Sequence, residues 1–425
     1  MSKCVERGRA RRSIVGLLAA HAISQTGNAV TLLAVPFYVL ATGGSGSEVG
    51  LAAAFATIPV VIGGPLGGVL VDRIGYRKSS ILADLVSGLT VLAIPVLALT
   101  IGLPFWALLA LVFLGGLLDT PGQTARRVML PAVSTLAQIR LERSVGFLDG
   151  VERLASMLGA SVAGLLIGAL GPANALFLDA ASFGLSALIM ASLVSKEPGA
   201  ASGNASDAVR KTKGYWAELL EGFRFVRKQR LLLAIVVMVL LTNLFDAART
   251  SSLMPLYANS RLGGAAALGS LLAIFGAGAL LGTIGFGMIA HRMPRRMTFA
   301  LCFILAGPPA ILAFAVGLPF GWLLFICALS GLASGALNPI LGALQLELVP
   351  EGMRARVFGL SRAGAWLGIP LGALLGGLAA DRLGLNQSFA IIAALYLLVT
   401  LAPLVVPVFK QMDRTPAPPS ARFRA

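Results

Sequence analysis

The sequence predicts an all-α membrane protein of twelve transmembrane helices in two pseudo-symmetric six-helix bundles. Three observations lead to this prediction: the composition, a series of long apolar runs, and a repeat between the two halves of the chain. The 425 residues are 57% hydrophobic and only 12% charged, with a mean hydropathy of +0.87. A soluble fold cannot hide so much apolar surface from water, so we expect the solvent to be lipid.

The chain contains twelve apolar runs of the length that a bilayer-spanning helix needs, about 20 residues. Lipid offers no hydrogen-bond partner to free backbone groups, so each run should be helical. The first run follows Arg11-Arg12 and holds an A-x-A sequence, as a signal peptide would, but it continues to about Ala41, and we interpret it as an uncleaved span. The expected spans are 14–41, 48–71, 79–101, 104–125, 144–169, 173–195, 231–258, 266–290, 297–317, 320–344, 358–380 and 387–409.

Lysine and arginine residues fall almost entirely in alternate loops, and this bias predicts the topology. One set of loops, which includes both termini, holds nearly all of them, whereas the other set holds only Arg261 and Arg382. Positive residues mark the cytoplasmic side, so we expect both termini to be cytoplasmic. The excess of 34 Lys and Arg over 18 Asp and Glu therefore reflects topology, and we expect no nucleic-acid partner.

Short sequences recur at an offset of 219 residues and predict an internal duplication. Pro36–Tyr38 recurs as Pro255–Tyr257, "DR" at 72–73 as "HR" at 291–292, and "LP" at 130–131 as "VP" at 349–350. The predicted organisation is a first six-helix bundle at 1–195, a cytoplasmic linker at 196–230, and a second bundle with a cytoplasmic tail at 231–425. Parallel repeats of this kind occur in transporters whose site lies between the halves.

The linker contains a polar stretch followed by an amphipathic segment. Apolar residues recur at helical spacing in the second part, with Arg and Lys among them: Trp216, Leu219, Leu220, Phe223 and Val226. This pattern is typical of a helix on the cytoplasmic membrane surface. A helical lead-in to span seven explains the same pattern equally well.

Glycines and charges cluster at the end of span two, in "GGPLGGVLVDRIGYRK" at 63–78. Glycines four residues apart leave one helix face bare, which lets another helix approach closely. The acid that follows lies at the membrane edge, where it can reach a helix N-terminus or a cation. A later glycine turns the chain, and the basic residues face the anionic inner leaflet. The residues concerned are Gly64, Gly68, Asp72, Arg73, Gly75, Arg77 and Lys78.

This segment resembles the loop 2–3 signature of the major facilitator superfamily. The resemblance implies the major facilitator fold. It also implies that Asp72, Arg73 and Arg77 form a cytoplasmic latch that stabilises the outward-open state. In the second copy His291 replaces the Asp and Pro294 replaces the Gly. We therefore expect an asymmetric latch in which the first half dominates.

Within the superfamily the chain is similar to the bacterial drug-exporter branch of macrolide-efflux and enterobactin-exporter proteins. The similar segments are 24–39, 117–134 and 171–183. This resemblance implies proton-coupled efflux of amphipathic organic compounds by alternating access, in a multipass protein of the bacterial cytoplasmic (inner) membrane. The chain departs from the branch at Gly159–Gly164, where Ala160 replaces the usual proline, and we expect no arginine in the middle of span four. An importer or facilitator of a small metabolite remains an alternative, and a non-transporting membrane sensor is a more distant one.

Polar residues inside the apolar runs predict a substrate cavity, because such groups are costly in lipid. In span one the spacing i, i+4, i+7 places His21, Gln25 and Asn28 on one face. Span seven repeats the spacing with Thr242, Asp246 and Arg249, beside Asn243. Polar contacts between packed helices are the alternative, and Asp246 and Arg249 also have the spacing of a structural ion pair.

Span five contains the acids that we expect to couple transport to protons. Asp149 and Arg153 are four residues apart and can pair, which would leave Glu152 as the unpaired acid near mid-membrane. Asp149 and Asp246 are further candidates for coupling. In the alternative, this helix begins later and all three span-five charges lie among the headgroups. Four acids nearer the span ends are expected to cap helices or form ion pairs: Asp84, Asp119, Asp179 and Glu347.

The sequence holds no pattern of catalysis or metal binding. It has no P-loop, HExxH, GxSxG or paired Cys/His set, so we expect no enzyme activity, no metal and no cofactor. Cys4, Cys302 and Cys327 fit no disulfide framework and are interpreted as free thiols. The expected partners are a small-molecule substrate, protons and the lipid bilayer, and we expect a monomer.

Overall fold

The computed structural model describes residues 2–195, 215–350 and 353–413. Within these ranges it does not describe the side chains at 2–10, 63–70, 72–73, 142, 215–219, 291 and 355. The predicted latch residues Gly64, Gly68, Asp72 and Arg73 therefore lie outside the described side chains, as do His291, Cys4 and Trp216.

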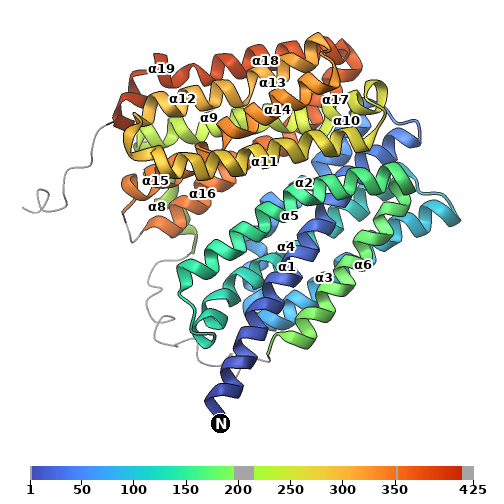
Figure 1. Ribbon diagram of the computed structural model, residues 1–425, viewed down its shortest axis with the longest axis vertical. Helices are drawn as coiled ribbons and strands as arrows, with labels where there is room; N and C mark the ends of the chain where they lie inside the picture. The colour runs from blue at the N-terminus through green and yellow to red at the C-terminus, as the bar shows by residue number, and fades with distance from the viewer. Residues whose placement is uncertain (1, 196–214, 351–352, 414–425) are drawn as a thin grey trace, which may run out of the picture. The chain divides into compact units, whose positions relative to one another are not determined.

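Helices account for nearly all of the described chain (Figure 1). The first six are α1 (Ser2–Ala41), α2 (Gly46–Ile74), α3 (Tyr76–Thr100), α4 (Phe105–Leu136), α5 (Leu141–Leu170) and α6 (Pro172–Leu193). The later ones are α8 (Tyr215–Lys228), α9 (Arg230–Ala247), α10 (Met254–Arg261), α11 (Ala265–Ile289), α12 (Arg295–Ala306), α13 (Pro308–Val316), α14 (Phe320–Ser334), α15 (Leu337–Leu348), α16 (Arg354–Trp366), α17 (Gly368–Leu383), α18 (Leu385–Thr400) and α19 (Ala402–Val405). A π-helical turn, Ala248–Leu253, joins α9 to α10.

Eleven helical stretches of the described residues are long and apolar enough to cross a membrane. They correspond to the predicted spans one and three to twelve. The predicted second span falls on α2, which has 29 residues and whose apolar part is described over Gly46–Ile62. The all-α multipass architecture is confirmed.

Span four is longer than predicted. The sequence places its end at residue 125, but α4 continues to Leu136. Arg126 therefore lies inside the helix, ten residues before its end, rather than in the loop after it. Span five also begins earlier than predicted, at Leu141, so Asp149 and Glu152 lie within α5. The later helix start in the alternative is therefore wrong, whereas its placement of the three span-five charges among the headgroups stays a prediction.

Contacts divide the chain into two compact units. Unit 1 comprises Met1–Ala208, Ala247–Gly276 and Ile369–Leu385, and unit 2 comprises Val209–Asp246, Ala277–Gly368 and Asn386–Ala425. Within unit 1, α1 packs against both α5 and α6, and α3 packs against α4 and α6 (Figure 1). Within unit 2, α12 packs against α13, α14 and α19.

The amphipathic helix α8 packs against α16. Glu221 and Arg356 form an ion pair with a 3.6 Å separation, and Val226 joins a small buried cluster with Leu232 and Val357. Leu220 and Phe223 are exposed. Only Gln229 separates α8 from α9, so the helix does lead into span seven. Contact with the membrane surface stays a prediction.

Candidate functional site

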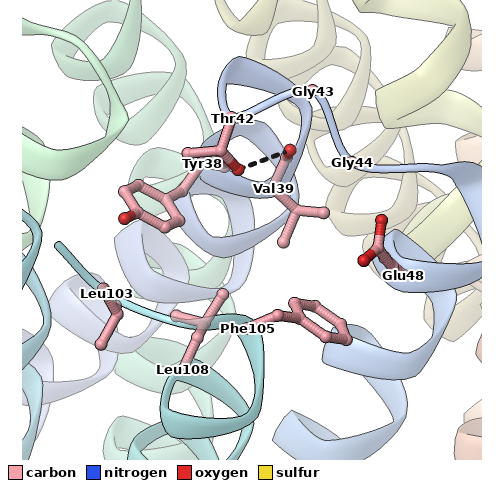
Figure 2. Close-up of a pocket in the computed structure, with 9 residues that line it drawn as sticks. All are labelled: Tyr38, Val39, Thr42, Gly43, Gly44, Glu48, Leu103, Phe105 and Leu108. Atoms are coloured by element: carbon pink, nitrogen blue, oxygen red, sulfur yellow. Dashed lines mark hydrogen bonds between the residues drawn. The ribbon is translucent and has the colours of Figure 1, made fainter.

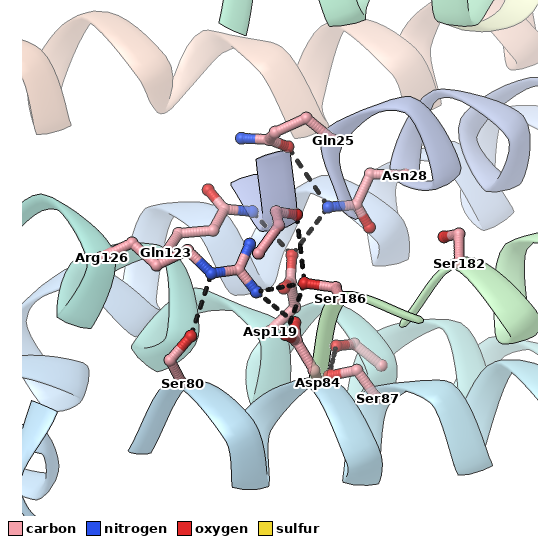
Figure 3. Close-up of polar contacts among 12 residues, drawn as sticks. Gln25, Asn28, Ser80, Asp84, Ser87, Asp119, Gln123, Arg126, Ser182 and Ser186 are labelled. Carbon is pink, nitrogen blue, oxygen red and sulfur yellow. Dashed lines mark hydrogen bonds and ion pairs between the residues drawn. The ribbon is translucent and has the colours of Figure 1, made fainter. Parts of the chain in front are cut away.

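A buried ion pair connects α3 and α4 (Figure 3). The Arg126 side chain on α4 and the Asp84 side chain on α3 are both fully buried, and Arg126 Nη2 donates to Asp84 Oδ1. Arg126 Nε donates to Ser80 Oγ at 3.0 Å. Ser186 on α6 accepts from Arg126 Nη2 at 3.3 Å and donates to Asp84 Oδ2 at 2.8 Å. These contacts tie three helices together around one neutralised pair.

A second carboxylate, Asp119 on α4, connects this region to the polar face of α1. Asn28 Nδ2 donates to Asp119 Oδ2 at 2.8 Å, and Gln123 Nε2 donates to the same oxygen at 2.6 Å. Asn28 also donates to Gln25 Oε1 at 3.3 Å. Figure 3 shows these three amides around Asp119 and the Arg126 guanidinium. Of the three predicted cavity residues of span one, Asn28 therefore contacts a buried acid directly, and Gln25 contacts Asn28.

A third buried carboxylate, Asp179 on α6, is bound by hydroxyl groups. Thr31 Oγ1 on α1 donates to Asp179 Oδ2, and Ser182 Oγ donates to Oδ1 at 3.2 Å. The side chain is 1% exposed, and that of Asp119 is 4% exposed. Among the described side chains, neither acid forms an ion pair. A buried carboxylate without a cation is costly unless it holds a proton, so this cluster is chemically suited to proton exchange.

The sequence placed these three acids near span ends and assigned them to capping or ion pairing. Ion pairing is confirmed for Asp84, and for Glu347, whose two oxygens accept from Arg295 Nη1 at 2.8 and 2.6 Å. The position near a span end is wrong for Asp119, because α4 continues to Leu136, whereas Asp84 and Asp179 lie eight and seven residues after the starts of α3 and α6. Their occurrence within apolar runs was the available signal.

The acids of span five have a partner that the sequence analysis missed. Arg127 Nη2 binds Glu152 Oε2, and Arg127 Nη1 lies 3.8 Å from Asp149 Oδ1. The expected pairing of Asp149 with Arg153, which would have left Glu152 unpaired, is therefore wrong. His21 Nε2 lies 4.0 Å from Glu152 Oε2, and the imidazole is fully buried. His21 thus contacts this second acidic group rather than the Asn28 network.

The predicted polar residues of span seven contact several different helices. Asn243 Nδ2 donates to the Ala365 carbonyl at 2.9 Å, and Asp246 Oδ2 accepts from the Tyr396 hydroxyl at 3.2 Å. Thr242 donates to the carbonyl of Val239 on its own helix. In unit 1, the guanidinium carbon of Arg249 lies 5.8 Å from the centre of a phenylalanine ring on α11. Most of these side chains therefore connect neighbouring helices. The predicted role of the four residues in a substrate cavity stays a prediction.

The basic end of the predicted latch anchors a helix terminus. Gly75 joins α2 to α3 with a φ of 91°, as its predicted role as a turn requires. Arg77 donates to two carbonyls at the end of α6, those of Ala191 at 2.5 Å and Val194 at 2.8 Å. Such carbonyls lack intrahelical partners, so a cation satisfies them. Lys78 is exposed.

The second half repeats this anchor at the predicted offset of 219 residues. Arg296, at the start of α12, donates to the carbonyls of Pro403 and Leu404, both at 2.6 Å. Pro403 and Leu404 lie in α19, at the C-terminal end of the last predicted span, as Ala191 and Val194 lie at the C-terminal end of α6. The repeat seen in the sequence is thus also a repeat of contacts.

A cavity of about 270 Å³ lies at the other end of α1, next to its turn into α2 (Figure 2). Tyr38, Leu103, Phe105, Leu108 and Glu48 are among the residues that line it. Glu48 accepts from the backbone N–H of Ser45 at 2.8 Å and caps the start of α2. This cavity is separate from the buried network.

These features can be compared with known proteins. The family model of the Major Facilitator Superfamily matches residues 17–268 and 240–425. The chain belongs to this superfamily. It is therefore a membrane transporter rather than an enzyme.

Several relatives carry names that describe efflux. The chain is 30% identical to "Multidrug efflux pump Tap" of Mycolicibacterium fortuitum over 96% of this chain and 99% of that protein. It is 29% identical to a protein of the same name from Mycobacterium tuberculosis (strain ATCC 25618 / H37Rv), over 94% of both chains. It is 24% identical to "Macrolide efflux protein A" of Streptococcus pyogenes, over 93% and 96%. The predicted resemblance to the drug-exporter branch is confirmed.

Solved structures confirm the fold alone. The nucleoside transporter NupG has a TM-score of 0.71 at 15% identity, covering 94% of this chain and 99% of that one. A bacterial homologue of the human lysosomal transporter Spinster has a TM-score of 0.72 at 16% identity, covering 96% and 99%.

Proposed function

We propose that this transporter exports amphipathic organic compounds, including drugs, in exchange for protons and by alternating access. Its similarity to named multidrug and macrolide efflux pumps over nearly the whole chain supports the efflux role. The observation that supports proton coupling is the buried Asp119 carboxylate, which accepts hydrogen bonds from Asn28 and Gln123 and forms no ion pair among the described residues.

Asp119 and Asn28 provide a way to link substrate binding to proton binding. Asn28 lies on the α1 face that the sequence assigns to the cavity, and its amide binds the acid directly. The ionised Asp119 carboxylate attracts a cationic substrate bound beside Asn28, and such a substrate in turn favours the ionised form. Protonation of Asp119 removes the charge and weakens substrate binding. Substrate and proton then compete, which antiport requires.

Glu152 is the second candidate for the proton-carrying acid. Its contacts with Arg127 and its position 4.0 Å from His21 Nε2 give it a cation and a buried imidazole as neighbours. Asp149 shares Arg127, and Asp246 is hydrogen-bonded to Tyr396, so we assign both to positioning or gating rather than to coupling.

Transport in everted vesicles tests this proposal, with ethidium as the probe. We expect a protonophore to abolish uphill ethidium transport by the unaltered protein. Asp119→Asn keeps the side-chain shape but removes the titrating group, so uphill transport should fall at least about tenfold while downhill exchange continues. Glu347→Gln, which neutralises an exposed acid, is the matched control and should transport normally.

Two outcomes would contradict parts of the proposal. Normal uphill export by Asp119→Asn combined with its loss in Glu152→Gln would transfer coupling to Glu152. Uphill export that does not respond to the protonophore would exclude proton coupling altogether, although efflux itself would stand.

We further propose that the protein acts as a monomer with both termini in the cytoplasm, and that its domains are those of the duplication, 1–195 and 231–425. The lysine and arginine bias supports this orientation. The latch at Asp72, Arg73 and Arg77 is proposed to hold the cytoplasmic end closed, on the resemblance of its motif.

A further inference from the structure

An acid at the end of α17 binds the start of α2. Asp381 Oδ1 accepts from the backbone N–H of Gly46 at 2.8 Å, and Oδ2 accepts from that of Ser47 at 2.7 Å. The first N–H groups of a helix have no partner within the helix, and its N-terminal end attracts negative charge. Hydrogen bonds to an ionised carboxylate are stronger than those between neutral groups. Both oxygens of Asp381 are therefore used in one contact between two helices.

The two helices cross closely beside this contact, because small residues meet there. A Cβ atom at Gly50 would lie 2.5 Å from the Ala373 carbonyl oxygen, and one at Gly377 would lie 2.1 Å from that of Gly46. Glycine is required at both positions for the backbones to approach this closely. Opening this end of the helices must therefore break the crossing and the Asp381 contact together.

The residues around Asp381 repeat the latch motif. Residues 67–75 read "GGVLVDRIG" and residues 376–384 read "GGLAADRLG", with the pattern G-G-x-x-x-D-R-x-G in both. Each copy ends in a glycine of positive φ, 91° at Gly75 and 78° at Gly384, directly after its helix. The backbone setting is thus the same in the two copies.

The two copies stand at opposite ends of the membrane helices. The motif of α2 ends that helix, whereas the motif of α17 contacts the first turn of α2. A helix of 29 residues spans about 43 Å, so one copy lies at each membrane surface. By the predicted topology, Asp72 is cytoplasmic and Asp381 is extracytoplasmic.

The pseudo-symmetric crossing in the same unit has no such acid. In this crossing Gly164 of α5 lies against Gly269 of α11, as Gly377 lies against Gly50. A Cβ atom at Gly164 would lie 2.7 Å from the Ala265 carbonyl oxygen, and one at Gly269 would lie 2.6 Å from that of Ala160. Four residues after Gly164, where Asp381 follows Gly377, the chain has Gly168. An acid is therefore present at one of the two crossings, and a close crossing of this kind forms without one.

We infer that Asp381 is a gating residue of the transport cycle, which holds the extracytoplasmic end closed by binding the start of α2 and releases it when that end opens. Asp72 is the proposed counterpart at the cytoplasmic end. The inference rests on the alternating access proposed above, but it does not depend on which ion drives transport.

Cysteine labelling from outside intact cells tests the inference. Ala373 is fully buried in the crossing, so Ala373→Cys, in a chain without its three native cysteines, reports when α17 leaves α2. Asp381→Asn keeps one accepting oxygen and loses the charge. We expect the labelling rate of Cys at 373 to rise about tenfold, as the loss of one hydrogen bond to a charged group predicts. Asp72→Asn should lower the same rate.

Matched variants separate gating from folding. Asp413→Asn is the control, because Asp413 also accepts from a backbone N–H at a helix start, that of Arg296 at 3.0 Å, and it should leave labelling unchanged. Ile101→Cys, 81% exposed in the loop between α3 and α4, should label equally in all variants and thereby confirm the orientation.

A second variant keeps the test decisive if Asp381→Asn does not fold. Ser47→Pro removes the donor to Oδ2 without altering the acid, and proline is tolerated in the first turn of a helix, as at Pro172 in α6. Labelling at 373 that stays at the unaltered rate in a folded variant of either kind would overturn the gating role. Failure of ethidium transport with increased labelling would leave it standing.

Discussion

The first six helices and the later helices share helix-end and helix-crossing contacts but differ in their buried charge. Arg77 and Arg296, 219 residues apart, each anchor the end of the last helix of their half. Gly50 and Gly269, also 219 residues apart, each make a close helix crossing. These pairs show that the duplication extends to individual backbone contacts.

Buried charge, in contrast, is concentrated in the first half. Asp84, Asp119, Arg126 and Asp179 are all buried there, whereas Arg249 is the one buried charged side chain among the residues described from 230 onward. The comparison shows that both halves contribute similar helix-packing contacts, while the buried charged side chains of the described residues lie mainly in the first half.

The largest effect should come from breaking the buried ion pair. Arg126→Ala leaves Asp84 as an uncompensated buried charge, which costs about 3–5 kcal/mol. Gln345 occupies the position 219 residues later, and Gln345→Ala should cost less than about 1 kcal/mol. Thermal unfolding in detergent measures both. Equal losses would remove the distinction between the halves.

A double variant shows what that pair contributes. Replacing both partners by apolar residues, as in Arg126→Met with Asp84→Leu, should recover much of the stability but abolish ethidium export. Retained export by a folded double variant would show that the pair is structural and takes no part in transport.

Arg126 also shows why the sequence predicted the framework better than the site. Apolar runs identify helices because lipid demands them, and a duplicated sequence repeats its contacts. The adjacent charges Arg126 and Arg127 ended the predicted fourth span, since hydropathy does not reveal which way a side chain points. Neighbouring residues on a helix point about 100° apart, so Arg126 faces inward to Asp84 while Arg127 faces Glu152. The partner residues on other helices decide which way each arginine points, and the spacing of residues in the sequence does not identify those partners.

An intermediate effect should follow from filling the two glycine crossings. A Cβ at Gly50 or Gly269 would meet a backbone oxygen at 2.5 or 2.6 Å, so Gly50→Ala and Gly269→Ala should each cost about 1–3 kcal/mol. Gly285→Ala on α11 meets nothing within 4 Å and should be neutral or stabilising. Thermal unfolding again provides the measurement, and clearly unequal costs at 50 and 269 would show that the shared framework has diverged.

The smallest effect should come from the ion pair that only the second half has. Arg295 and Glu347 pair with good geometry, but their side chains are 41% and 28% exposed, whereas those of Arg126 and Asp84 are fully buried. Water and salt screen an exposed pair, so Glu347→Gln should cost no more than about 1 kcal/mol of stability. The difference in stability between this variant and the unaltered protein should shrink as salt rises from about 0.05 to about 1 M. Unfolding temperatures measured across that salt range test this. A large, salt-independent loss would mean that burial does not explain why the two ion pairs differ.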